Sequence, residues 1–282
     1  MPVADGGPVG IEPESMSGAW KRRFGAVLIA TVIACVATAC SGSSAESLRI
    51  LVSNDDGVEA EGIDLLVEAL LAQGYEVVVS APNGNRSGTS DWRGPSEFCG
   101  ELSVEQGATR SGYPATSIDG CPADAVAYGL TELFPGRRPH LVIAGLNEGP
   151  NLCEQLAGGV SGTVGAARTA ARLGMPALAA SQATTAPGEH ADFASGVESV
   201  VSWVQEHESI LMRRGIPASI TNMNTPTCEV GEIRGVVRNM PLAIDCAKVL
   251  DPQDCLSDVE NPTTDVEALI NGFVSIGPIP ID

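Results

Sequence analysis

The sequence predicts an α/β fold: a Rossmann-like, doubly wound, mostly parallel sheet with a small β-rich C-terminal extension. Short aliphatic runs alternate with longer segments whose apolar residues recur at helical spacing. The runs are almost continuously apolar, as expected of parallel strands that are buried on both faces. Polar loops follow several of these runs, at the position where such sheets bind ligands.

The first strand–helix–strand unit begins at residue 48. Residues 48–53 form a short aliphatic run that predicts a strand, and residues 76–80 form a valine-rich run that predicts a second one. Between them, residues 62–73 place isoleucine and leucine side chains on one helical face. A connection of this kind places its two strands parallel in one sheet.

The same alternation continues to about residue 211. The predicted elements are a helix over 122–133, a strand over 140–144, a helix over 163–172, a strand over 177–180 and a helix over 192–211. Gly174 follows the second of these helices and ends it. Because helices separate the strands, we expect both faces of the sheet to be covered.

Residues 1–39 predict a signal peptide of the lipoprotein type. Three basic residues at positions 21–23 precede an apolar run over 24–39, which is short for a membrane span. The run ends in Ala-Thr-Ala before Cys40, which looks like a bacterial lipobox, and residues 40–47 form a polar tether. We therefore expect an exported protein that is anchored to the cell membrane by lipid at Cys40.

Two alternatives to this anchor stay open. Cys35 ends a second lipobox candidate, although it lies inside the apolar run and lacks a polar tether. Ordinary cleavage after Ala39 would leave Cys40 unmodified and release a periplasmic or extracellular protein.

The net charge of −19 makes a nucleic-acid polymer an unexpected partner. A protein that binds along such a polymer needs a basic stripe. After residue 23 the basic residues form only short pairs, such as Arg137-Arg138 and Arg213-Arg214. The acidity favours a solvated surface and says little about the fold.

Six cysteines remain once Cys35 and Cys40 are assigned to the export segment: Cys99, Cys121, Cys153, Cys228, Cys246 and Cys255. In an oxidising compartment this even number predicts up to three disulfides. The last three are close enough in sequence for one local pair, but the connectivity stays open. No Cys-x-x-Cys or Cys/His spacing indicates a metal cluster.

Polar loops follow three of the predicted strands. Asp55 and Asp56 are adjacent carboxylates before Gly57, an arrangement that suits a hard divalent cation or, alternatively, an Asx-turn or helix N-cap. Residues 81–90 supply hydroxyl groups and one arginine, or are a plain surface loop. The Gly/Ser/Thr-rich residues 158–163 open a helix, where backbone N–H groups bind phosphate or are simply capped. Together the loops favour metal-assisted phosphate chemistry.

Several motifs in this order resemble the SurE nucleotidase family. They are ILVSNDDGVEAEGIDLLVEAL at 50–70, APNGNRSGTS at 81–90, DGCPADAVAYGL at 119–130, LVIAGLNEGPNL at 141–152 and VSGTVGAARTAARLGMPALAAS at 160–181. The resemblance covers about residues 48–226, which we expect to form the nucleotidase core, and it returns in GFVSIGPI at 272–279. Residues 227–282 would form a shortened C-terminal extension with the final strand.

The resemblance implies a metal-dependent phosphomonoesterase, a 5′-nucleotidase type of phosphoric monoester hydrolase, acting on nucleoside 5′- or 3′-monophosphates. It implies one divalent cation, Mg²⁺ or Mn²⁺, held by residues matching Asp55, Asp56, Ser87 and Asn147. The matching phosphate-pocket residues are Asn54, Asn151, Ser161, Gly162 and Thr163. As a hypothesis, Asp55 or Asp56 also orients or deprotonates the attacking water. The family uses its C-terminal region for subunit exchange, so the shortened extension leaves a homodimer open.

Two rival functions are distinguishable. A dinucleotide-binding oxidoreductase would share the fold but needs a G-x-G-x-x-G turn where this chain has Asn54-Asp55-Asp56-Gly57. A non-catalytic exported lipoprotein that binds a metal or a phosphate ester would use the same residues as the enzyme. Its distinguishing property is the absence of turnover.

Overall fold

The computed structural model describes residues 46–185 and 191–282. The predicted signal peptide, the lipid-anchored Cys40 and residues 40–45 of the tether lie outside the described residues and stay predictions. Within the described part of the chain, no helix has the length and apolarity that a bilayer crossing needs.

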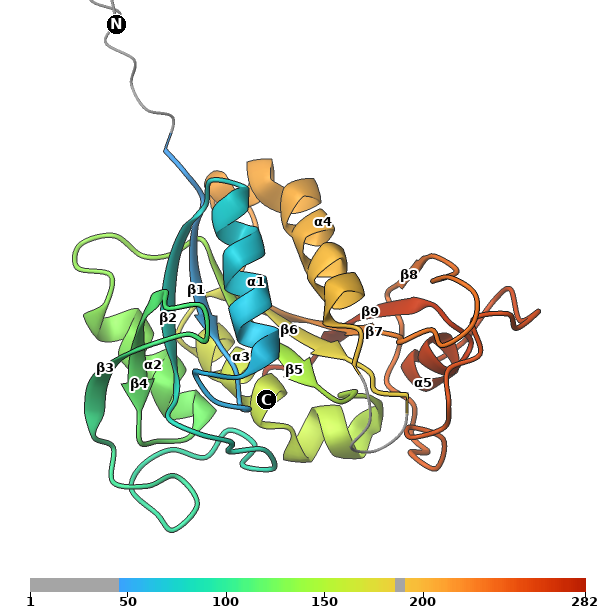
Figure 1. Ribbon diagram of the computed structural model, residues 1–282, viewed down its shortest axis with the longest axis horizontal. Helices are drawn as coiled ribbons and strands as arrows, with labels where there is room; N and C mark the ends of the chain where they lie inside the picture. Colours follow the sequence, from blue (N-terminus) through green and yellow to red (C-terminus); the bar gives the residue numbers. More distant parts are fainter. Residues whose placement is uncertain (1–45, 186–190) are drawn as a thin grey trace, which may run out of the picture. The chain divides into compact units, whose positions relative to one another are not determined.

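The described residues form a nine-stranded sheet in the order β3-β4-β2-β1-β5-β6-β7-β9-β8 (Figure 1). The strands are β1 (Arg49–Ser53), β2 (Glu76–Pro82), β3 (Val104–Ala108), β4 (Pro114–Ile118), β5 (Leu141–Glu148), β6 (Pro176–Gln182), β7 (Ser219–Thr225), β8 (Val236–Arg238) and β9 (Val274–Ile279). From β4 to β7 every neighbouring pair is parallel, whereas β3 and β9 run antiparallel to their inner neighbours. The predicted doubly wound, mostly parallel sheet is confirmed.

Helices cover both faces of this sheet. They are α1 (Glu61–Ala72), α2 (Pro122–Glu132), α3 (Gly162–Arg172), α4 (Phe193–Met212) and α5 (Asp265–Ile270), with a π-helical segment, η1 (Cys153–Val160), before α3. Side chains of β1 alternate between two apolar cores: Ile50 and Val52 pack under α1 and α4, while Leu51 packs under α2 and α3. Figure 1 shows α1 and α4 lying together on one face.

Four strands were not predicted from the sequence: β3, β4, β7 and the short β8. Strands β3 and β4 form a hairpin at the edge of the sheet. Most of β3 is exposed, so its sequence lacks the apolar run that predicts a buried strand. Strand β7 is polar in sequence although it lies inside the sheet, because its asparagines bind another loop. Strand β5 runs past the predicted end at residue 144, with a shift of register between Ala144 and Asn147.

All six cysteines of the described body form disulfides. The pairs are Cys99–Cys121, Cys153–Cys246 and Cys228–Cys255. The expected local pair of the C-terminal region is therefore Cys228–Cys255, while Cys246 links that region to the start of η1. The extension contains β8, β9 and the short helix α5.

Candidate active site

The strand order reverses between β1 and β5. From β1 the chain continues outward through β2 and β4, and from β5 it continues through β6 and β7 in the other direction. In open α/β sheets the crevice beyond the carboxyl ends of the strands at such a reversal is the usual ligand site. Here β1 leads into Asp55 and Asp56, while β5 carries Asn147 and Glu148 at its end.

Asp55 is buried, with 3% of its surface exposed. Its Oδ1 accepts a hydrogen bond of 2.6 Å from the hydroxyl of Thr163 in the first turn of α3. Its backbone carbonyl accepts from the N–H of Arg86 at 2.7 Å. Asp55 thus joins the end of β1 to both neighbouring loops, which explains its fixed orientation.

Asp56 is more accessible and has two polar partners. Its Oδ2 accepts from the backbone N–H of Glu148 at 3.0 Å, and its Oδ1 accepts from Asn85 Nδ2 at 3.3 Å. It lines a cavity of about 370 Å³ together with Asn85, Arg110 and Glu148. Asp56, rather than Asp55, is therefore the carboxylate that faces open space.

Neither carboxylate has an arginine or lysine partner among the described ion pairs. Burial raises the pKa of Asp55, although the hydrogen bond from Thr163 acts in the opposite direction. Burial, the charge of Asp55 and that of Glu148 raise the pKa of Asp56 to about 7. Two adjacent like charges, one buried and one partly buried, are costly without a basic partner, and a bound cation would offset that cost.

Ser87 lies on the loop after β2 and is exposed. Its backbone N–H donates to Asn85 Oδ1 at 2.9 Å, and Asn85 in turn donates to Asp56. Gly57 lets the turn after β1 lie against the loop after β2. At its φ of +112°, a Cβ would lie 3.0 Å from the backbone of Gly84. The predicted ligand Ser87 is thus connected to the carboxylate pair through Asn85.

Asn147 and Asn151 occupy the end of β5 and the turn that follows. Asn147 donates its Nδ2 to the carbonyl of Gly149 at 2.6 Å, which leaves its Oδ1 as the atom suited to a cation. Asn151 donates its Nδ2 to Ser181 Oγ at 2.9 Å, and its N–H to Asn224 Oδ1 at 2.7 Å. Asn151 is therefore anchored to β6 and β7, and its loop is held over the sheet.

The start of α3 closes the other side of the site. Ser161 caps the helix, because its hydroxyl accepts from the N–H of Val164 at 3.0 Å. A Cβ on Gly162 would lie 2.8 Å from Asp55 Oδ2, so only glycine allows the backbone this close to the carboxylate. The structure thus brings the start of α3 directly against the predicted metal ligand.

Two predicted phosphate-pocket residues have their side chains engaged elsewhere. Asn54 is fully buried, and its amide exchanges hydrogen bonds with the backbone of Gly57 at 3.0 and 3.2 Å. Thr163 is fully buried and donates to Asp55. In this structure both side chains position the Asp55–Asp56 turn, and their contact with phosphate stays a prediction.

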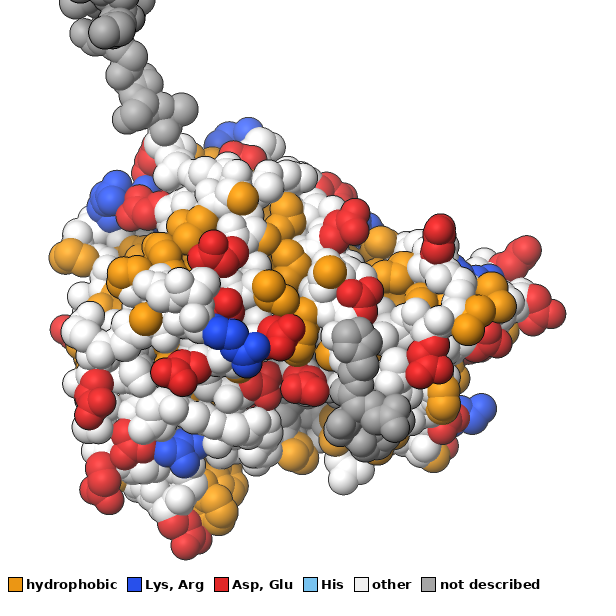
Figure 2. All heavy atoms as spheres, viewed as in Figure 1, with side chains coloured by type: hydrophobic (Ala, Val, Ile, Leu, Met, Phe, Trp, Pro, Cys, Tyr) orange, Lys and Arg blue, Asp and Glu red, His pale blue; other side chains and the backbone are white. Residues whose placement is uncertain are grey.

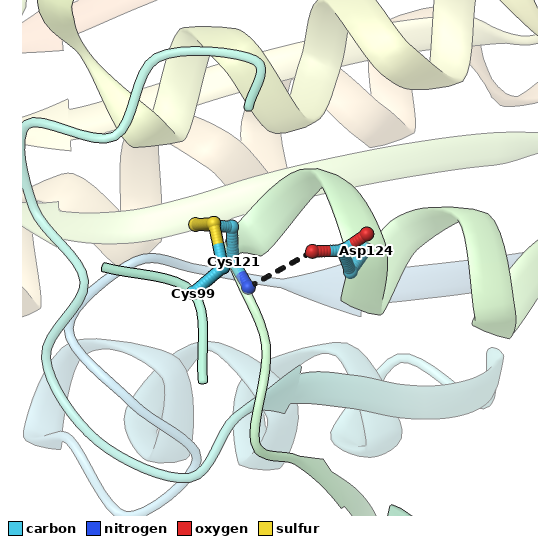
Figure 3. A group of neighbouring side chains, drawn as sticks. All are labelled: Cys99, Cys121 and Asp124. Carbon is cyan, nitrogen blue, oxygen red and sulfur yellow. Dashed lines mark hydrogen bonds between the residues drawn. A yellow bond between two sulfur atoms is a disulfide. The ribbon is translucent and has the colours of Figure 1, made fainter. Parts of the chain in front are cut away.

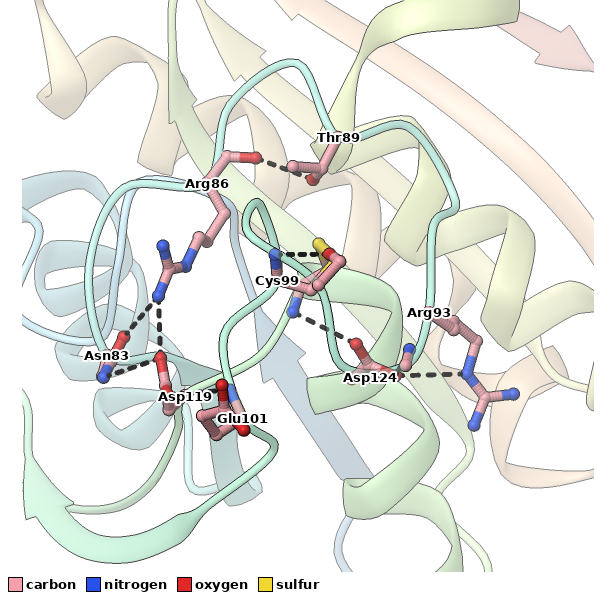
Figure 4. The surroundings of a disulfide bond; sticks show 11 residues. Asn83, Arg86, Thr89, Arg93, Cys99, Glu101, Asp119 and Asp124 are labelled. Atoms are coloured by element: carbon pink, nitrogen blue, oxygen red, sulfur yellow. Dashed lines mark hydrogen bonds and ion pairs between the residues drawn. A yellow bond between two sulfur atoms is a disulfide. The ribbon is translucent and has the colours of Figure 1, made fainter.

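Arg86 points away from the carboxylate pair. Its Nη2 donates to Asp119 Oδ1 at 2.8 Å, and Figure 4 shows this contact beside Asn83. The N–H of Glu101 also donates to Asp119, and this hydrogen bond, together with the charge of Arg86, lowers the pKa of Asp119. The arginine thus ties the loop after β2 to the start of the segment that leads into α2.

Cys99, Cys121 and Asp124 form a cluster with the spacing of a metal site, but its chemistry is different (Figure 3). Both sulfur atoms belong to one disulfide and offer no thiolate. The Asp124 carboxylate accepts from the N–H of Cys121 at 3.2 Å and caps α2. The cluster therefore has a structural role: it links the segment around Cys99 to the N-terminus of α2.

Residues that the sequence reasoning missed are Asn85, Glu148, Asn222 and Asn224. Asn85 and Glu148 lie inside motifs already singled out, yet nothing local shows that they contact Asp56. Asn222 and Asn224 lie two residues apart, so a strand places both on one face, and both donate to the carbonyl of Asn151. The spacing of these two asparagines could have predicted a strand with one polar face.

Comparisons with known proteins agree with this arrangement. Residues 50–242 match the family described as survival protein SurE. The chain is 32% identical to the 5′-nucleotidase SurE of Alkaliphilus metalliredigens, over 83% of this chain and 93% of that protein. It is 33% identical to the 5′/3′-nucleotidase SurE of Cronobacter sakazakii, over 83% and 91%. The crystal structure of the SurE protein from Aquifex aeolicus superposes with a TM-score of 0.63 at 29% identity, covering 83% of this chain and 94% of that one.

The fold and the site define a doubly wound α/β protein with an acidic, oxygen-lined site at its switch point, beside a helix N-terminus. The match over residues 50–242 and the identity to full-length relatives narrow this class further. The chain belongs to the SurE family.

Proposed function

We propose that this chain is a divalent-metal-dependent phosphomonoesterase that hydrolyses nucleoside 5′- or 3′-monophosphates to a nucleoside and phosphate. The activities named for its relatives support the reaction class. The observation that carries the proposal is a pair of adjacent carboxylates without a basic partner among the described ion pairs. Asp55 is buried against the start of α3, and Asp56 is partly buried beside it.

The oxygen donors fit a hard divalent cation. The carboxylates of Asp55 and Asp56, the Oδ1 of Asn147 and the hydroxyl of Ser87 are the ligand types that Mg²⁺ and Mn²⁺ prefer. A bound ion would polarise a phosphoryl oxygen and lower the pKa of a bound water. Thr163 and Asn54 would keep the carboxylates in place, because both side chains are hydrogen-bonded within the turn and helix that carry the site.

Asp56 is the better candidate to orient the attacking water. Asp56 is partly exposed, whereas Asp55 is buried and held by Thr163. Water would attack phosphorus as the ester P–O bond breaks, and its proton would pass to Asp56 before reaching the leaving nucleoside oxygen. The phosphate would lie against the backbone of Ser161 and Gly162, where a helix N-terminus favours negative charge.

Export and lipid anchoring at Cys40 are part of the same proposal. Three disulfides in the described body support an oxidising compartment. Partition of the protein into a detergent phase, compared with that of a Cys40→Ser variant, tests the anchor. Equal partition of the two proteins would contradict it. The homodimer stays a prediction.

Phosphate release from a panel of nucleoside monophosphates tests the catalytic proposal. We expect turnover with Mg²⁺ or Mn²⁺ and none with EDTA. A folded protein that releases no phosphate with either ion would instead support a non-catalytic lipoprotein that binds a metal or a phosphate ester. Turnover unchanged by EDTA would contradict the metal dependence.

A further inference from the structure

A second cavity lies at the opposite end of the sheet, where the parallel strands begin. Its volume is about 600 Å³, and its charged or titratable lining residues are Glu46, Arg49, Arg137, Arg138, His140 and Arg214. Arg49 begins β1, and His140 directly precedes β5. This cavity is therefore separate from the site at the carboxyl ends of the same strands.

The charge of this cavity is opposite to that of the whole chain, whose net charge is −19. Acidic side chains are spread over the face of the molecule shown in Figure 2. In the cavity, Arg49 pairs with Glu46, and Arg137 pairs with Glu76 at 3.2 Å. Arg138 and Arg214 take part in no ion pair among the described residues. Four guanidinium groups against two carboxylates leave an excess of two positive charges.

His140 adds no positive charge to this balance. Its ring lies in the wall of the cavity and is almost fully buried. Its Nδ1 accepts a hydrogen bond of 2.9 Å from the N–H of Arg49. Burial and the charge of Arg49 lower the pKa of His140, which favours the neutral imidazole. The excess charge therefore rests on the arginines.

The arginines are held in place by main-chain carbonyls. Arg214 donates to the carbonyls of Pro139 and Arg138 at 2.9 and 2.8 Å, and Arg49 donates to the same Arg138 carbonyl at 3.2 Å. Arg138 donates to the carbonyl of Leu173. A guanidinium has five N–H donors, so Arg138 and Arg214 keep several for a ligand. Converging guanidinium groups with spare donors recognise phosphate in preference to monovalent halide, because they can bind it bidentately.

We propose that this cavity binds a phosphate group, supplied either as free phosphate or by the headgroup of an anionic phospholipid. The two sources share the chemistry of a tetrahedral phosphoryl anion between Arg138 and Arg214. Glu46, the first described residue of the chain, is among the residues that line the cavity. The proposal does not depend on the catalytic function of the other site.

Arginine modification in the full-length chain tests the proposal at single-residue resolution. Phenylglyoxal labels accessible arginines, and peptide mass spectrometry reports each one separately. With inorganic phosphate we expect labelling of Arg138 and Arg214 to slow by at least about threefold, as two-thirds occupancy requires. Arg213, exposed and outside the cavity lining, is the internal control and should label at an unchanged rate.

Vesicles separate the two sources of phosphate. Protection by phosphatidylglycerol vesicles but not by inorganic phosphate assigns the lipid headgroup, and protection by inorganic phosphate assigns the free anion. Phosphatidylcholine vesicles control for simple masking of this end by a membrane. No protection by either probe, or equal protection of Arg213, would overturn the proposal. Protection of Arg138 that persists in Arg214→Gln but disappears in Arg213→Gln would also overturn it.

Discussion

The sheet core, residues 48–226, and the C-terminal extension, residues 227–282, are stabilised in different ways. In the core, the central strand β1 has Ile50, Leu51 and Val52 fully buried. In the extension, Ile244 is 84% exposed and Leu256 is 69% exposed. Two of the three disulfides have at least one cysteine in the extension. The extension buries a small apolar cluster that includes Val266 and Leu269, and the two covalent links add to this packing.

The difference shows how the molecule keeps a charged site in place. The buried core carries Asp55 without a basic partner in the described body, and its apolar packing offsets part of the cost of that charge. The extension instead holds η1, because Asp265 accepts from the N–H groups of Cys153 and Ala243 at 2.7 Å each. Since η1 leads into Ser161 and α3, the extension supports the second wall of the site.

Asp55→Asn should have the largest effect, and it should reduce activity without reducing stability. We expect phosphate release to fall on the order of 10⁴-fold, equivalent to about 5.5 kcal/mol of transition-state stabilisation. The free energy of unfolding should not decrease, because the substitution removes a buried charge that lacks a basic partner. Steady-state kinetics and urea unfolding measure the two quantities.

Asp251→Asn makes the same chemical change on the exposed surface of the extension. It should leave both activity and unfolding unchanged. An equal loss of activity in the two variants would contradict the assignment of the catalytic carboxylate to the core.

Removing the Cys153–Cys246 disulfide should mainly reduce stability. A double serine variant opens a cross-link with a sequence separation of 93 residues, so we expect a loss of about 4.6 kcal/mol in urea unfolding. The Cys228–Cys255 pair, with a separation of 27, should cost less, about 3.5 kcal/mol. Only the first variant should also raise KM, because only Cys153 belongs to η1. A KM rise that is equal in both variants would contradict the role given to η1.

Gly162→Ala should reduce kcat while leaving the protein folded. The added Cβ would lie 2.8 Å from Asp55 Oδ2 and 3.3 Å from the Arg86 carbonyl, so the carboxylate must shift. A displacement of this kind costs about 10- to 100-fold in rate. Gly158→Ala is the matched control, because a Cβ there meets nothing within 4 Å. Equal kcat values for the two variants would show that the carboxylate tolerates the shift.

Ile244→Gln should have the smallest effect. The side chain is exposed on the extension, so we expect a change in the free energy of unfolding within about 0.5 kcal/mol. A loss above about 2 kcal/mol would mean that this surface is covered in solution, for example by a second copy of the chain. Analytical ultracentrifugation of the same variant would then show the change in assembly.

The helical and apolar periodicity predicted most of the sheet core. The predicted helix over 62–73 agrees with α1 to within one residue, because its leucines fill the core. Strand β7 escaped prediction because Asn222 and Asn224 are polar residues that support Asn151. The adjacent carboxylates and the loop motifs indicated the site, but the contact of Thr163 with Asp55 spans 108 residues of sequence and follows only from the topology.

Mn²⁺ binding to the purified chain tests the central claim most directly. Electron paramagnetic resonance of free Mn²⁺ should show one tightly bound ion per chain in the wild type and in Asp251→Asn. In Asp55→Asn the affinity should fall at least about tenfold, since a charged ligand is lost. Equal Mn²⁺ binding by Asp55→Asn and the wild type would contradict the assignment of the cation to this end of the sheet.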